Sequence, residues 1–392
     1  MKTIAQENTS LDTDAKAEDG KTHSSSAPVA AEQSSPSTTH PAAQGGSRRA
    51  TMGGKPVFTR PAKSVINFDS GFKQKLLCDG PTFTMGDSCV YSCSFCFVAD
   101  MMTKARAKGG FLSHIPAELE HAGFVSRRDG AVECLREQLT TRLKGGGRKA
   151  KFDNANDNRV IYSSPLVDCA ANMDLVRETV EACKVILELT NWHIRLLSKS
   201  NLLPKLAQEL IKTTRAPGWE DAVRRRLIFG VSTGTLDDAQ AAAFEQGCPK
   251  VSKRIESLHW LQDEGFRTFG MICPSLPQRD YPTWAAEMAL AIRAHRCEHV
   301  WAEVMNPRGA AMPQTVAALH AAGYEWQAQQ LDLVSKDKSA WEDYARQTFL
   351  AHVLNYSNAH GPGVSRLRYL QYVNKSNAAW WSFHIAEGAV LL

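Results

Sequence analysis

Short apolar runs alternate with longer amphipathic segments from residue 82 onward, and this alternation constrains the fold more than any other feature of the chain. Six runs are rich in branched or aromatic residues and are typical of buried strands. Four intervening segments, 173–189, 202–212, 251–265 and 281–295, have the period of helices. The predicted strands are TFTMG (82–86), RVIYSS (159–164), HIRLLS (193–198), RLIFGVS (226–232), FRTFGMI (266–272) and HVWAEVM (299–305).

Strands that alternate with helices are expected to pair in parallel, because each helix carries the chain back to the start of the next strand. We therefore expect an α/β fold, either an open doubly wound sheet or a partial barrel. In both architectures ligands bind at the carboxyl ends of the strands. Functional residues should accordingly follow the six runs closely.

The two ends of the chain differ from this central region. Residues 1–56 are rich in Ser, Thr, Ala, Gln and Gly, and they contain too few apolar residues to offset the entropy of ordering. They are predicted to be a disordered tail. Residues 57–308 form the predicted core, and residues 309–392 a mostly helical C-terminal extension.

Composition indicates the compartment in which we expect the protein and the partners that it could bind. The 392 residues carry a net charge of +5, which allows a polyanionic partner without requiring one. We find no run near the roughly 18 apolar residues of a membrane span and no signal-peptide core, so we expect a cytoplasmic protein without a membrane partner. Because disulfides are rare in a reducing compartment, clustered cysteines there suggest metal ligands or catalytic thiols.

Three of the ten cysteines cluster in DSCVYSCSFCF (87–97), just after the first predicted strand: Cys89, Cys93 and Cys96. A structural zinc site needs four ligands, for which His114 or His121 could supply the fourth. An iron–sulfur cluster on three thiolates would leave one iron open to a cofactor or substrate. Structural cysteines are the third alternative. The other cysteines form no second close cluster in sequence, so we expect only one iron–sulfur centre.

The spacing Cys89-x₃-Cys93-x₂-Cys96, with Phe95 before the last cysteine, resembles the signature of radical S-adenosylmethionine enzymes. The resemblance implies a [4Fe–4S] cluster whose open iron binds S-adenosylmethionine and, when reduced, cleaves it to a 5′-deoxyadenosyl radical that abstracts a substrate hydrogen. It also implies a (β/α)₆ partial TIM barrel and a flavodoxin or ferredoxin-type reductant.

Residues 80–280 are similar to the spore photoproduct lyase-like branch of that superfamily. The segment LLSKSNLLPKLAQEL places Ser198 and Lys199 at a strand end, and FGVSTGTLDD places Ser232 at the next. The resemblance makes Lys199, Ser232 and Ser198 candidate contacts to S-adenosylmethionine, with Ser164 a weaker one. It extends to Glu245, Pro249, Arg254, Pro274 and Pro277. Ordinary alternatives are a solvated lysine and structural strand-end serines.

The chain departs from the lyase after the second predicted strand, where the lyase carries a hydrogen-donating cysteine. The segment reads IYSSPLVDCAANM, so Ser163 or Ser164 stands near that position and Cys169 comes later. Cys169 is the candidate catalytic thiol, with a buried structural role as the alternative. Asp168 could bind substrate, or cap the helix that begins near Met173.

The substrate stays open between a nucleic-acid base, as in DNA repair by a lyase, and a protein or small molecule. A non-enzymatic zinc-stabilised binding protein is the remaining hypothesis. Glu303, Asn306 and Arg308 lie at the end of the sixth strand and could contact substrate. Residues that could follow phosphates or stack on bases are Lys104, Arg106, Lys108, Arg148, Lys149, Lys151, Arg224–Arg226, Arg366, Arg368, Tyr369, Tyr372 and Lys375.

Overall fold

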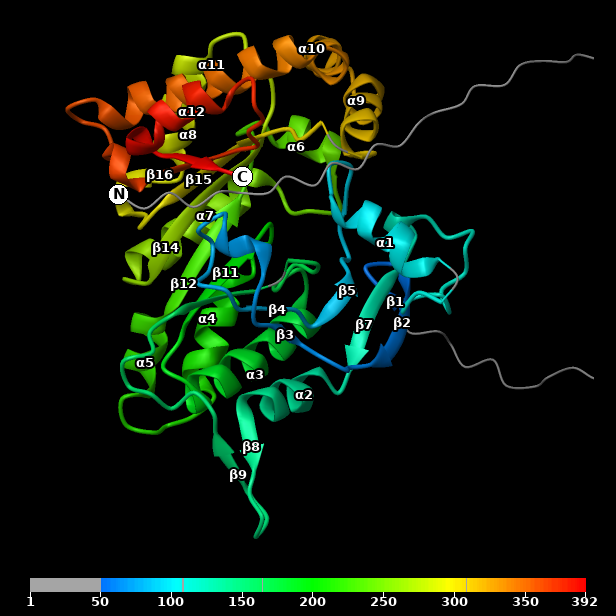
Figure 1. Cartoon of the computed structure of the whole chain (residues 1–392), viewed down its shortest axis with the longest axis vertical. Helices are drawn as coiled ribbons and strands as arrows, with labels where there is room; N and C mark the ends of the chain where they lie inside the picture. Colours follow the sequence, from blue (N-terminus) through cyan, green and yellow to red (C-terminus); the bar gives the residue numbers. More distant parts are fainter. Residues whose placement is uncertain (1–50, 108, 164, 308) are drawn as a thin grey trace, which may run out of the picture. The chain divides into compact units, whose positions relative to one another are not determined.

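A nine-stranded sheet organises the computed structural model, which describes residues 51–107, 109–163, 165–307 and 309–392. All neighbouring strands pair in parallel except β3 and β4, which are antiparallel. The order across the sheet is β17 (Ala389–Leu391), β16 (Leu367–Gln371), β15 (Val300–Val304), β14 (Arg267–Ser275), β12 (Leu227–Ser232), β11 (His193–Ser198), β10 (Val160–Ser163), β4 (Thr82–Phe83) and β3 (Ile66–Asn67) (Figure 1).

The six predicted strands are confirmed as β4, β10, β11, β12, β14 and β15, in parallel register. The first run is shorter than predicted, because residues after Phe83 leave the sheet and Gly86–Ser88 form β5 in a second sheet. Within the part of the chain that the structure describes, no pairing joins the edge strands β3 and β17. The fold is therefore mixed α/β with a predominantly parallel sheet.

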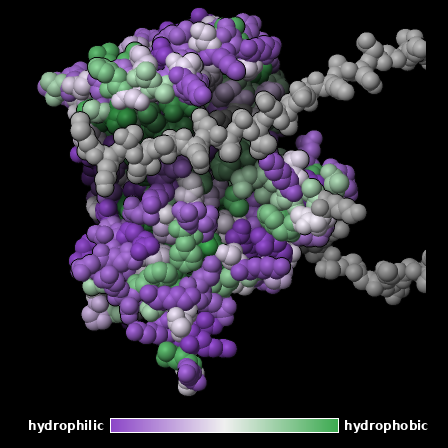
Figure 2. Space-filling view, in the orientation of Figure 1, coloured by the Kyte–Doolittle hydropathy of each residue, from purple (hydrophilic) through white to green (hydrophobic). Residues whose placement is uncertain are grey.

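The four predicted helices are also confirmed, as α3 (Met173–Leu189), α4 (Leu203–Lys212), α7 (Val251–Asp263) and α8 (Tyr281–Ala291). Two further helices, α5 (Trp219–Arg226) and α6 (Asp238–Phe244), were not predicted. Charged residues fill much of α5, which leaves it a weak apolar stripe. Figure 2 shows many hydrophilic side chains on the lower left of the face in view, where α5 lies in Figure 1.

The region after residue 309 contains the helices that the sequence predicts and two strands that it does not. Its helices are α9 (Ala311–Ala321), α10 (Glu325–Lys336), α11 (Lys338–Ser357) and α12 (Ala378–Phe383). Strand β16 pairs with β15, and β17 with β16, so this region extends the central sheet. Arg366 and Arg368 interrupt the apolar pattern around β16, which hides the strand from sequence analysis.

A second, four-stranded sheet follows the order β1 (Thr51–Met52), β2 (Lys55–Pro61), β7 (Val125–Asp129), β5. Most of the predicted tail, residues 1–50, lies outside the described residues. Residues 51–56 correct that prediction, because they form β1 and the start of β2. The remaining elements are α1 (Val98–Arg106), α2 (Ala131–Leu139), the hairpin β8 (Thr140–Arg142) and β9 (Arg148–Ala150), and the short pair β6 (Ser92–Cys93) and β13 (Glu245–Gln246).

The two faces of the central sheet bury different clusters. Alternate strand residues such as Leu196 and Phe229 join the large core with the helices. Their neighbours on the opposite face, such as Ile228, Phe269 and Trp301, form a smaller apolar cluster. Among the described residues, no helix has the length and apolar character needed to cross a membrane.

Candidate active site

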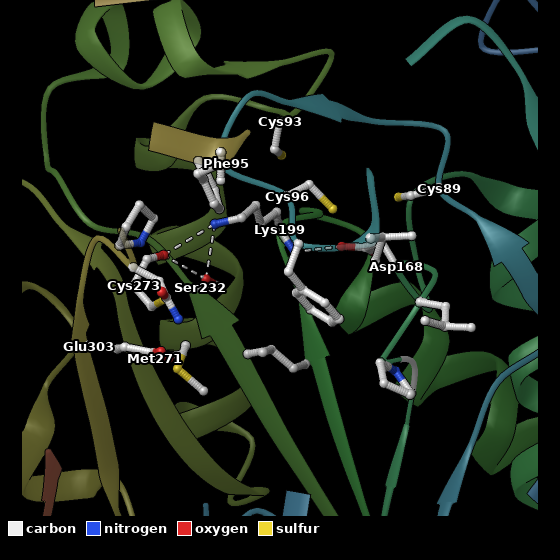
Figure 3. A pocket seen from close by; sticks show the side chains of 18 of the residues that line it. Cys89, Cys93, Phe95, Cys96, Asp168, Lys199, Ser232, Met271, Cys273 and Glu303 are labelled. Atoms are coloured by element: carbon white, nitrogen blue, oxygen red, sulfur yellow. Dashed lines mark hydrogen bonds between the residues drawn. The ribbon is translucent and has the colours of Figure 1, made fainter. Parts of the chain in front are cut away.

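A cavity of about 560 Å³ opens at the carboxyl ends of the central strands, where the fold predicts a site. One end is lined by the cysteine loop and the other by residues from β15 and the segment after β16. Figure 3 shows the side chains that face it. Among them are Cys89, Cys93, Cys96, Asp168, Lys199, Ser232, Met271, Cys273 and Glu303.

The cysteine loop is anchored to the segment that follows α6. Strand β6 pairs with β13, with Cys93 opposite Glu245. The Ser94 N–H donates to the Phe244 carbonyl at 2.9 Å, and the Phe95 ring lies 5.7 Å from that of Phe244, centroid to centroid. In Figure 3 the side chains of Cys89 and Cys96 point toward one another. The fold therefore gathers all three predicted ligands on one cavity wall.

The cysteine thiols would have to lose their protons before they could bind a metal. Burial raises the pKa of Cys89 and Cys96 to about 12, so a bound metal must displace their protons. Within the described ranges, no three His, Cys, Asp or Glu side chains converge closely enough to hold one metal ion. A zinc ion binds its ligands at a single centre, whereas an iron–sulfur cluster binds each thiolate at a different iron.

A fourth cysteine lies beside this loop and was not identified from the sequence. Cys248 Sγ is 3.6 Å from Cys93 Sγ, although the two residues are 155 positions apart. Lys55 from β2 donates to Ser92 Oγ at 2.7 Å and brings a cation to the same place. The pairing of β6 with β13 creates this neighbourhood, so no local spacing could reveal it.

Lys199 and Ser232, two candidates taken from the resemblance, contact each other. Lys199 Nζ donates to Ser232 Oγ at 3.0 Å and to Glu245 Oε1 at 2.6 Å. Arg254 Nη1 lies 2.5 Å from Glu245 Oε2, and both of these side chains are 1% exposed. Burial opposes the charge on Lys199, yet Glu245 prevails and the pKa of Lys199 is raised. Lys199 therefore presents a stable ammonium group to the cavity.

Asp168 organises the neighbouring strand end and does not cap α3. Its carboxylate accepts hydrogen bonds from Ser198 Oγ and the Lys199 N–H, both at 2.7 Å. Burial raises its pKa despite these bonds. Asn172 caps α3 instead, because its side chain is close enough to accept from the Leu175 N–H at 3.0 Å. The capping prediction for Asp168 was wrong, and the Ser198 hydroxyl is bonded to Asp168.

The structure places Cys169, one of the two remaining sequence candidates, away from the cavity wall. Cys169 is 2% exposed, donates to the Leu197 carbonyl at 3.5 Å, and is not among the described residues that line the cavity. This placement matches its structural alternative. Ser164 lies outside the described residues. Cys273, at the carboxyl end of β14, lines the cavity and was missed although its position after a predicted strand could have indicated it.

The end of the cavity away from the cysteines carries an ion pair. Lys75 Nζ lies 3.4 Å from Glu303 Oε2 and 5.5 Å from the centre of the Tyr372 ring. Burial raises the pKa of Glu303, while Lys75 opposes that shift. Glu303 and Asn306 both line the cavity, as their position at the end of the sixth strand suggested. Arg308 lies outside the described residues.

Several of the basic residues considered for nucleic acid contact other groups of the protein. Arg226 donates to the backbone carbonyls of Leu187, Thr190 and Trp192, at the amino end of β12 and away from the cavity. Arg106 donates to the Leu119 carbonyl at 2.5 Å, and Arg148 pairs with Glu137. Of the residues named for this role, Tyr372 lines the cavity; Lys108 lies outside the described residues.

Comparison with known proteins gives structural matches alone. No protein-family model matches the sequence, and no curated protein matches it. A spore photoproduct lyase variant matches at 10% identity and a TM-score of 0.44, over 66% of this chain and 65% of that one. The lyase complexed with dinucleoside spore photoproduct also matches at 10% and 0.44, over 67% and 66%.

A third match is the radical S-adenosylmethionine methyltransferase TsrM from Kitasatospora setae, at 11% identity and a TM-score of 0.34, over 56% of this chain and 35% of that one. The chain is thus similar in structure to radical S-adenosylmethionine enzymes, and it spans about two thirds of the lyase. Similarity at this level carries no argument about activity. Functional inference therefore rests on the residues of the site.

Proposed function

We propose that this chain is a radical S-adenosylmethionine enzyme that holds a [4Fe–4S] cluster on Cys89, Cys93 and Cys96. The observation that supports it best is the shared cavity, which three cysteines line together with Lys199 and Ser232. When bound, the cluster would supply the electron that cleaves S-adenosylmethionine to methionine and a 5′-deoxyadenosyl radical.

The chain's own residues bind and orient the cofactor in this proposal. The Lys199 ammonium is suited to a carboxylate and the Ser232 hydroxyl to a polar oxygen. Glu245 and Arg254 hold Lys199 in place. Apolar side chains around the rest of the cavity keep water from a reactive intermediate. Six parallel strands are compatible with the partial barrel of this family, which forms part of the proposal.

Two finer elements complete the proposal. A flavodoxin or ferredoxin-type protein supplies the electron, and a substrate enters the end of the cavity opposite the cysteines. The partners of Arg226, Arg106 and Arg148 leave less support for a long nucleic-acid strand than for a small molecule or a single exposed group. A lyase acting in DNA repair is accordingly the second candidate.

Anaerobic reconstitution with iron and sulfide tests the proposal. The wild-type chain should bind about four iron atoms and four sulfides and, after reduction, convert S-adenosylmethionine to 5′-deoxyadenosine. Cys93→Ala should lose both properties. Cys134→Ala is the matched control, because Cys134 lies in α2 and is not among the described residues that line the cavity.

Bound zinc without acid-labile sulfide would contradict the enzyme hypothesis. About eight irons per chain would contradict the expectation of a single cluster. Retention of full iron content by Cys93→Ala would show that the loop is not the ligand set.

A further inference from the structure

The cavity end formed by Lys75 and Glu303 has the properties of a binding site. Their side chains are 23% and 13% exposed, so both charges are largely withdrawn from water. The 3.4 Å separation leaves them paired but not tightly hydrogen-bonded. Both residues line the same cavity as the cysteines.

Backbone contacts fix Lys75 in place. Trp301 Nε1 donates to the Lys75 carbonyl at 2.8 Å. Arg195 Nη1, itself buried, donates to the Leu77 carbonyl at 2.6 Å. Glu303 is fixed because it belongs to β15. Because rigid elements already hold this charge pair, little further conformational entropy is lost when a ligand binds.

Charge balance restricts what this end can accept. Lys75 and Glu303 are neutral as a pair, so a ligand that brings one charge would leave an uncompensated charge in a desolvated site. A ligand that brings a cation and an anion on adjacent atoms gives each protein charge a partner and keeps the site neutral. The ammonium and carboxylate of a free α-amino acid have this arrangement, whereas a peptide terminus carries only one of the two groups.

The surrounding wall favours an apolar group over a stacked base. The rings of Phe72 and Tyr162 pack on each other with centroids 5.3 Å apart, which leaves no slot for a base between them. The Tyr372 ring already faces Lys75. Met271 and Leu370 add aliphatic surface to the same cavity.

We propose that Lys75 and Glu303 bind the carboxylate and ammonium of a free α-amino acid with an apolar side chain. The inference rests on the proposed function for the reaction that follows. Figure 3 shows Cys273 and Met271 near Glu303 on the way to Ser232 and Lys199. The side chain of the amino acid would extend along this path, toward the end of the cavity where the cofactor is proposed to bind.

Calorimetric titration of the reconstituted protein with S-adenosylmethionine present tests the inference by binding alone. The probes are L-leucine, L-phenylalanine and L-tryptophan. At least one should bind, and its N-acetyl and carboxamide derivatives should each bind at least tenfold more weakly, because each lacks one charge. Thymidine and uridine serve as neutral ring probes.

Variants connect that binding to the two residues. Lys75→Met and Glu303→Gln should each weaken amino-acid binding at least tenfold without changing the affinity for S-adenosylmethionine, and Lys75→Arg should retain part of it. Lys336→Met is the matched control, since Lys336 pairs with Asp332 on an exposed helix face. Circular dichroism checks that each variant is folded.

Three results would overturn the inference: none of the amino acids binds, thymidine or uridine binds more tightly than all of them, or both variants bind like the wild type. Failure of the proposed function has a different signature. It appears as missing cluster and missing 5′-deoxyadenosine, whereas failure of the inference appears in the titration.

Discussion

Two buried carboxylates flank the cysteine loop, and each is contacted by two cations. Asp87 accepts from Arg60 Nε at 2.7 Å and from Arg128 Nε at 2.8 Å. Glu245 accepts from Lys199 Nζ at 2.6 Å and lies beside Arg254. Both carboxylates are at most 1% exposed. The charge arrangement is the same on the two sides, but the surroundings differ.

The cations around Asp87 come from β2 and β7 of the small sheet, and among the described residues neither lines the cavity. Around Glu245, Lys199 does line it. Asp87 therefore stabilises the strand that leads into the cysteine loop, whereas Glu245 holds a cation that a ligand can share. The two ion pairs thus differ in whether one partner lines the cavity, and the proposed role of Lys199 rests on this difference.

The largest effect is expected from Asp87→Ala. The change should lower the free energy of unfolding by about 3–5 kcal/mol, because it leaves Arg60 and Arg128 without their buried partner. Urea unfolding measures this. Asp332→Ala is the control at an exposed pair and should cost no more than about 1 kcal/mol. Equal losses in the two variants would contradict the structural role of Asp87.

Lys199→Met sharpens the other side of the comparison. Loss of a charged hydrogen-bond donor should weaken S-adenosylmethionine binding by roughly 10- to 150-fold. Arg254 still pairs with Glu245, so the variant should unfold at a higher urea concentration than Asp87→Ala. Titration of the reconstituted protein, beside Lys336→Met, measures the affinity. An unchanged affinity would rule out the proposed role of Lys199.

Acid should destabilise the Asp87 side selectively. Burial opposes its ionisation, but hydrogen bonds and charges from Arg60 and Arg128 prevail and lower the pKa of Asp87 below 3.8. A carboxylate whose pKa is lower in the folded state than in the unfolded state stabilises the fold at pH values above its unfolded pKa. This contribution is lost as the pH falls through its folded pKa. Below about pH 4, the urea concentration at the unfolding midpoint should fall in the wild type. It should fall less steeply in Asp87→Asn. If the urea midpoints of the wild type and Asp87→Asn fell equally with pH, titration of Asp87 would not explain the acid destabilisation.

Cys169→Ala is expected to have the smallest effect. The thiol is buried outside the described cavity wall, so the change should lower stability by about 1 kcal/mol and leave 5′-deoxyadenosine formation unchanged. Chemical unfolding and product analysis on the same preparation measure both. Normal cluster content with lost product formation would restore Cys169 as a catalytic candidate.

The central strands could be predicted because runs such as RLIFGVS are apolar throughout and bounded by polar residues. Strand β2, with the sequence KPVFTRP, follows a polar segment and alternates with charged residues, so it was assigned in part to the tail. Strand β16 was missed for a similar reason. Short edge strands depend on their neighbours more than on their own composition.

The residues of the site likewise include some that the local sequence marks and some that it does not. The three cysteines, Lys199 and Glu303 were identified because local spacing or a strand end marks them. Lys75 and Cys248 carry no such mark, since a loop and a distant turn bring them to the cavity. Tertiary contact, which a single sequence does not encode locally, accounts for both omissions.

Strands β16 and β17 have a practical consequence for dissecting the chain. A fragment that stopped at residue 308 would leave the backbone groups of β15 unpaired along one side. Such an edge favours pairing with a strand of another molecule. It would also lose Leu370 and Tyr372 from the cavity wall. The last 84 residues therefore cannot be trimmed as a dispensable appendage, and any minimal version of this protein must keep the helices and strands beyond the predicted core.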